Sequence, residues 1–108
     1  MKILYTGDDA RMPFQIMHGG VVMAIDPGDN VEAALRTIEG VLLAGPWLVL
    51  EATPESDWPN GIVVVEVDGT DTQALPEQPA QIEIQITTGG RRLTWSSRPI
   101  RVVSDTIP

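Results

Sequence analysis

The chain has 108 residues, with fifteen acidic residues against seven Lys and Arg and a formal net charge of −8. This charge repels the phosphates of nucleic acids and anionic lipids, so neither is expected as a partner. The chain has no cysteine and no apolar run near the about 20 residues that span a bilayer, so disulfides, thiolate metal sites and a membrane helix are excluded.

At this length a single domain with one core is expected over residues 1–108, with 1–6 and 104–108 as candidate flexible ends. In the N-terminal part, alternating apolar residues predict short strands at 1–5, 13–17 and 21–25. In the second of these, Phe14 and Ile16 should face inward. The turn formers at 26–30 then separate this part from the middle of the chain.

Two interpretations compete for residues 31–40, VEAALRTIEG. Intrinsic propensity favours a helix with Asp29 or Asn30 as N-cap and Gly40 just past its end. A strand, with Val31, Ala33 and Leu35 on one face, agrees better with the β-pattern of every neighbouring element. We expect the strand.

The C-terminal half predicts further strands at 46–52 and 62–67, and a long hairpin at 81–103. In the hairpin, a period of two continues on both sides of Gly89-Gly90 and places Ile82, Ile84 and Ile86 on one face. Trp47 and Trp95 fit the strand pattern and are expected in the core. The two most apolar runs, 41–50 and 62–67, are predicted to be central strands. In total, seven or eight short strands indicate an all-β, antiparallel, two-sheet sandwich.

The sequence offers few residues suited to catalysis. The one histidine, His18, lies beside Gly19-Gly20 and is expected to be an exposed loop residue, and no serine stands in a nucleophile motif. The strand carboxylates should face water, where a raised pKa is not expected. We therefore predict no catalytic residue, no cofactor and no enzyme activity.

A metal site is also not predicted. Asp26 with Asp29, and Asp68 with Asp71, offer hard oxygen ligands suited to calcium, but neither pair completes a binding loop. Aspartate is also a favoured turn residue, and we expect turn chemistry at both pairs.

Five residues are candidates for a binding surface: Arg91, Arg92, Arg98, Arg101 and Trp58. The arginines lie in or near the hairpin, either as solvated strand residues or as contacts for an acidic surface of a neighbouring subunit. Trp58 either caps one end of the sandwich or, if it is exposed, offers a stacking platform for a sugar.

The order of landmarks resembles small phage tail domains similar to the N-terminal domain of baseplate upper proteins. The landmarks are the Gly-Asp turn at 6–9 with the strand at 14–17, the Val-x-Ala-x-Leu-Arg run at 31–36, the Asp-Trp-x-x-Gly turn at 57–61, the Thr-x-x-Leu loop at 72–75, and the Ile-x-Ile, Gly-Gly and Arg-Leu-Thr-Trp hairpin at 82–95. They cover roughly residues 7–103.

This resemblance implies an immunoglobulin-like β-sandwich that works as an oligomeric structural piece of a virion, without an active site. The implied partners are other virion proteins and further copies of the chain, and the implied location is the virion. No fibre or host-binding region follows residue 108, so we expect such a region to belong to a separate protein. Tail, baseplate, neck and fibre-connector roles stay open. The alternatives are a carbohydrate- or ligand-binding module and a capsid decoration protein.

Overall fold

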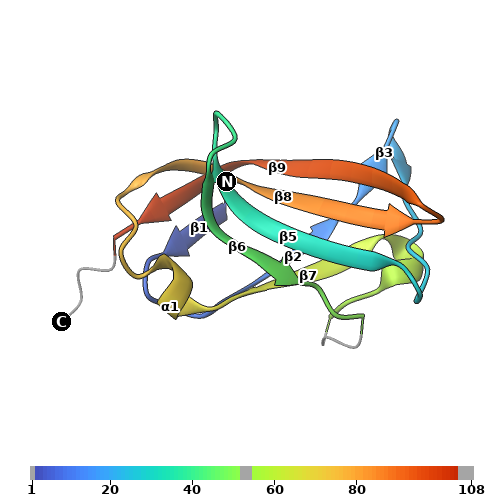
Figure 1. Cartoon of the computed structure of the whole chain (residues 1–108), viewed down its shortest axis with the longest axis horizontal. Helices are drawn as coiled ribbons and strands as arrows, with labels where there is room; N and C mark the ends of the chain where they lie inside the picture. Colours follow the sequence, from blue (N-terminus) through green and yellow to red (C-terminus); the bar gives the residue numbers. More distant parts are fainter. Residues whose placement is uncertain (1, 52–54, 105–108) are drawn as a thin grey trace.

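The computed structural model describes residues 2–51 and 55–104, and it is built almost entirely of strands (Figure 1). The described residues form nine strands, one short helix and one 3-10 turn. Their bounds are β1 (Lys2–Tyr5), β2 (Ala10–Gln15), β3 (Met17–His18), β4 (Val21–Val22), β5 (Asn30–Thr37), β6 (Leu42–Leu48), η1 (Trp58–Asn60), β7 (Ile62–Val67), α1 (Gly69–Thr72), β8 (Gln78–Thr88) and β9 (Arg91–Val103). The predicted all-β class is confirmed.

The largest sheet has five strands in the order β1-β9-β8-β5-β6. Three of its pairings are antiparallel, but β1 runs parallel to β9. The expectation of wholly antiparallel sheets is therefore wrong at this edge. A parallel pair needs a long connection, and here nearly the whole chain lies between its two strands. Residues 2–5, expected as part of a flexible end, are thus held in the sheet, where Leu4 is fully buried.

The predicted hairpin at 81–103 is confirmed as β8 and β9. Its inward residues Ile82, Ile84 and Ile86 are at most 1% exposed. Gly89 and Gly90 connect the strands with φ of 55° and 80°. Positive φ at both central residues is the geometry of a type I′ turn, whose twist matches that of the flanking strands.

A bulge in β9 keeps both of its apolar segments on the core side. Leu93 and Trp95 stand at odd positions, whereas Ile100 and Val102 stand at even ones, so a regular strand would turn one pair outward. The register shifts between the pairs Ile82–Ser97 and Ala80–Ile100. This places one extra residue on β9 and restores burial of Ile100 and Val102.

Residues 31–40 form a strand rather than a helix. β5 pairs with β6 on one side and with β8 on the other, and Val31, Ala33 and Leu35 are buried. Two neighbouring strands offer its backbone a complete set of partners, and this tertiary pairing overrides the helical propensity of the segment. The preferred prediction is confirmed.

A smaller layer covers one face of the five-stranded sheet. β2 and β7 pair antiparallel from Ala10–Val67 to Gln15–Ile62, and they lie below the large sheet in Figure 1. The Ile16 amide donates to the Gly61 carbonyl (2.8 Å), and the Met23 amide donates to the Ile16 carbonyl (2.9 Å), which extends this layer toward β3 and β4. Phe14 and Ile16 share one core with the isoleucines of β8, and so do Val63, Val65 and Val67 of β7. One core across residues of both layers is the arrangement expected for a single domain.

The prediction that 41–50 is a central strand is wrong. β6 lies at the edge of the five-stranded sheet, and β7 pairs only with β2 among the described residues. Continuous apolar runs predict burial but do not reveal sheet position. In β7 the run is buried, since Val63 and Val65 are fully covered, whereas Leu42 and Leu48 of β6 remain exposed.

The molecule is elongated, with extents of 44 × 28 × 23 Å. The β8–β9 turn and the β3–β4 hairpin lie at one end of its long axis, and α1 with the β1–β2 turn lies at the other (Figure 1). We call these the hairpin end and the α1 end.

Candidate functional site

The arginines proposed from the sequence do not form one cluster. Arg91 and Arg92 begin β9 at the hairpin end, and both are exposed. Arg101 is also exposed but lies ten residues further along the strand, or about 33 Å at about 3.3 Å per residue. The side chain of Arg98 lies outside the described residues. The hairpin end therefore carries a basic pair, and Arg101 belongs to the α1 end.

Trp58 is 3% exposed and belongs to the core, so it is not the exposed platform that sugar stacking requires. It opens η1, whose carbonyl at Trp58 accepts from the amides of Ile25 and Gly61, both at 2.9 Å. Its indole Nε1 has no hydrogen-bond partner among the described residues. Trp58 therefore covers the core at the hairpin end rather than offering a ring to a ligand.

In each aspartate pair, one carboxylate binds a nearby backbone amide. The amide of Asp26 donates to Oδ2 of Asp29 at 3.0 Å. The Oδ1 of Asp68 accepts from both the amide and the hydroxyl of Thr70, while Asp71 accepts from the indole of Trp47. The contact of Asp29 is the turn interaction that the sequence predicted, whereas the helix cap formed by Asp68 was not predicted. Across the described ranges, no three metal-ligating side chains come together.

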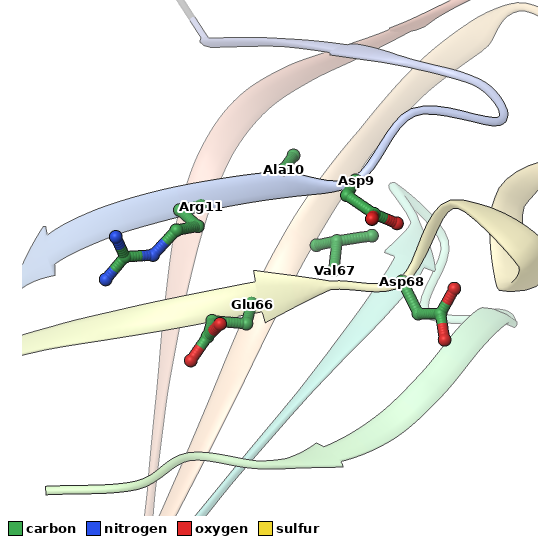
Figure 2. Close-up of a pocket in the computed structure, with 6 residues that line it drawn as sticks. All are labelled: Asp9, Ala10, Arg11, Glu66, Val67 and Asp68. Carbon is green, nitrogen blue, oxygen red and sulfur yellow. The ribbon is translucent and has the colours of Figure 1, made fainter. Parts of the chain in front are cut away.

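A shallow depression lies beside the ends of β2 and β7, with a volume of about 530 Å³ (Figure 2). Arg11 and Glu66 project from paired positions, and Asp9 and Asp68 stand where the two strands meet the 5–9 turn and α1. Asp9 accepts from the Gly69 amide at 2.8 Å, and Asp68 caps α1. Two of the three carboxylates that line the depression therefore bind nearby backbone amides. This structural role explains their presence there.

Exposed apolar side chains of the described residues gather at three places. The sequence pattern did not indicate them. Four flank or occupy β6, two lie on β1, and three lie at the β3–β4 hairpin: Val41, Leu42, Leu48, Leu50, Ile3, Tyr5, Met17, Val21 and Val22. β1 and β6 are the two edges of the large sheet. An apolar side chain on a sheet edge is a feature of sites that contact another chain.

The two edges differ in how open they are to another strand. In β6 the register shifts between the pairs Ala33–Trp47 and Leu35–Ala44, which places a bulge at Gly45 and Pro46. Proline lacks an amide N–H, and a bulge bends the strand, so β6 is poorly suited to strand addition. β1 has neither feature: its four residues pair in unbroken register with Ile100 to Val103.

On β1, Ile3 and Tyr5 are 53% and 49% exposed. They pair with Arg101 and Val103, and they share the outward face of the sheet, because Leu4 between them is buried. Alternation in the first five residues contained this signal, but it could not show which face the rest of the chain would cover.

The chain matches no family model and no curated protein. In the described parts of the chain, the structure contains no helix long and apolar enough to cross a membrane.

Proposed function

We propose that this chain is a non-enzymatic structural protein of a bacteriophage virion, which acts by assembling with further copies of itself and with other virion proteins. The order of landmarks along the sequence supports the virion assignment. The observation that carries the assembly role is the position of Ile3 and Tyr5, exposed on a strand at the edge of the large sheet.

The outer side of β1 can pair with a strand of another chain. The outer side of β1 presents backbone amides and carbonyls that β9 does not use, and another chain can pair with them. Burying the exposed parts of Ile3 and Tyr5 adds a hydrophobic contribution of about 25 cal/mol per Å². An edge of four residues is short, so a stable complex also requires contacts elsewhere on the surface.

We also propose that the fold is an immunoglobulin-like β-sandwich. An immunoglobulin-like sandwich requires two sheets that face each other over one core. A core shared by β2, β7 and the five-stranded sheet supports this assignment. An experimental structure of the chain tests it, and sheets that do not face each other would contradict it.

The first experiment is the solution mass of the chain, measured by light scattering after size exclusion across a concentration series. We expect a defined homo-oligomer. Ile3→Lys should shift the series toward the monomer, because it places a charge on the β1 edge. Gln73→Lys is the matched control, since Gln73 is exposed in the segment after α1 and outside any strand. A chain that stays monomeric at every concentration would contradict self-assembly.

A further inference from the structure

A groove at the hairpin end separates the β3–β4 hairpin from the start of β9. Its volume is about 250 Å³, and it is lined by His18, Met23, Thr88, Arg91 and Leu93. His18, Met23 and Leu93 also line an adjoining hollow of about 100 Å³ that reaches Ile86 and Trp95. We call the two together the hairpin-end groove.

The hairpin-end groove combines an apolar floor with a cationic rim. Met23 and Leu93 are half-buried, and Met17, Val21 and Val22 beside it are 44%, 69% and 37% exposed. Arg91 stands on the rim, whereas Arg92, the next residue of the strand, points to the opposite face. The chain as a whole has a net charge of −8, so the positive charge of Arg91 makes the rim of the groove opposite in sign to the protein as a whole.

The α1 end carries the complementary features in the turn at residues 5–9. Tyr5 is 49% exposed, and Asp8 and Asp9 follow it as exposed acids. The turn is fixed, because the Asp8 amide donates to the Tyr5 carbonyl at 3.3 Å and Gly7 has φ of 83°. The Gly7 amide also donates to Oγ1 of Thr72 at 3.1 Å. An exposed aromatic residue with exposed acidic residues three and four positions later is complementary to an apolar groove with an arginine on its rim.

The 5–9 turn cannot reach the groove of its own molecule. Tyr5 pairs with Val103, at the end of β9, whereas Arg91 begins the same strand. The twelve residues between these positions span about 40 Å at about 3.3 Å each, and Figure 1 places the two features at opposite ends of the long axis. Contact between them therefore requires two molecules.

We infer that the hairpin-end groove binds the 5–9 turn of a second copy of this chain, so that copies associate head to tail. The inference rests on the proposed self-assembly and specifies its interface. The two contacting surfaces differ, so the interface is heterologous, and it closes into a ring or continues as a filament, depending on the rotation between copies. Because each copy has a net charge of −8, two copies repel each other on average, and a contact that sets Arg91 against acidic residues is favoured over most other orientations.

Charge reversal with complementation tests the interface. The groove variant is Arg91→Glu, and the turn variant is Asp8→Arg. Each alone should raise the midpoint concentration of association about tenfold or more, with a smaller shift at high salt. Mixed in equal amounts, they should recover association, because the reversed groove of one variant then meets the reversed turn of the other.

Two further variants complete the design. Arg92→Glu makes the same charge change on the opposite face of the strand and should leave association intact. Tyr5→Ser removes the ring without changing charge and should weaken association even if Asp8→Arg does not fold. Circular dichroism and thermal unfolding confirm that each variant is folded.

The outcomes separate this inference from the proposed function. An oligomer that survives the groove variant and Tyr5→Ser at low salt overturns the head-to-tail interface and leaves self-assembly standing. Loss of association without rescue in the mixture also overturns it. A wild-type chain that is monomeric throughout contradicts self-assembly and, with it, this interface.

Discussion

The amide of Gly69 donates to the carboxylate of Asp9 across 2.8 Å, although sixty positions separate the two residues in the chain. This hydrogen bond joins the start of α1 to the turn between β1 and β2. The approach is so close that a Cβ on Gly69 would lie 2.3 Å from the carbonyl oxygen of Gly7. The α1 end is therefore built around a position where only glycine fits.

Gly69→Ala should destabilise the protein by about 1–3 kcal/mol, because the new methyl group meets backbone atoms that no side-chain rotation can move. The free energy of unfolding from urea titration measures the loss. Gly28→Ala is the control, since nothing lies within 4 Å of a Cβ there. The control should be neutral or slightly stabilising. Equal stability of both variants would show that the α1 end can shift to make room.

Asp68 gives α1 a pH-dependent cap. Hydrogen bonds from the backbone amide and then the hydroxyl of Thr70 lower the pKa of Asp68 below its ordinary value of 3.8. A pKa that is lower in the folded than in the unfolded state adds stability above the ordinary value, and this stability is lost as the pH falls through the lowered one.

Asp68→Asn should therefore lower the melting temperature at pH 7 slightly and reduce the difference from wild type as the pH falls below about 4. Thermal unfolding between pH 2.5 and 7 measures this change. Glu39→Gln, which removes an exposed carboxylate from the turn after β5, is the control for loss of charge alone. A difference that stays constant with pH would contradict the cap.

Arg36 and Glu83 form an ion pair on the outward face of the large sheet, with Nε and Oε1 3.2 Å apart. Their side chains are 29% and 22% exposed, so solvent screens the pair, and we expect a coupling of about 0.2–1 kcal/mol. A double-mutant cycle with Arg36→Met and Glu83→Gln measures it, and the coupling should shrink with added salt. A coupling well above this range would mean that the pair is more shielded than its exposure indicates.

Substitutions of Trp58 measure how much a buried indole N–H without a hydrogen-bond partner costs in stability. Trp58→Ala should cost about 3–5 kcal/mol, because it opens a large cavity in the core. Trp58→Phe should cost clearly less, since it keeps an aromatic ring and removes an Nε1 that has no partner among the described residues.

Trp47→Phe is the comparison for Trp58→Phe, since it removes an indole that donates to Asp71 at 2.9 Å. Urea unfolding of both phenylalanine variants reports the difference. If Trp58→Phe approached the cost of Trp58→Ala, the indole nitrogen would have a stabilising partner.

The local sequence pattern was sufficient to predict the β8–β9 hairpin and the inward faces of its strands. Ile82, Ile84 and Ile86 could be assigned to the core because alternation and a Gly-Gly turn are both local features. β5 was harder, because its local propensity favoured a helix and only its neighbours decided for a strand. The edge position of β6 was missed, because an apolar run looks the same at the edge and in the centre of a sheet.

The candidate surface was predicted only in part. Arg91 and Arg92 were identified from composition, but their separation from Arg101 depends on the length of β9. The exposure of Trp58 could not be judged from its turn, since the core that covers it comes from distant strands. The hairpin-end groove joins residues near 20 with residues near 90, and no local pattern connects those positions.

By itself, the sequence determined an all-β chain with no cysteine, a strong negative charge and a Gly-Gly hairpin, because alternation, turn chemistry and charge are properties of neighbouring residues. The tertiary structure decided which strands form edges, that β1 joins β9 in parallel, and that an exposed tyrosine and a basic groove stand at opposite ends of the molecule. Those features depend on contacts between residues far apart in the chain, whose pairing is selected by the burial of one common core.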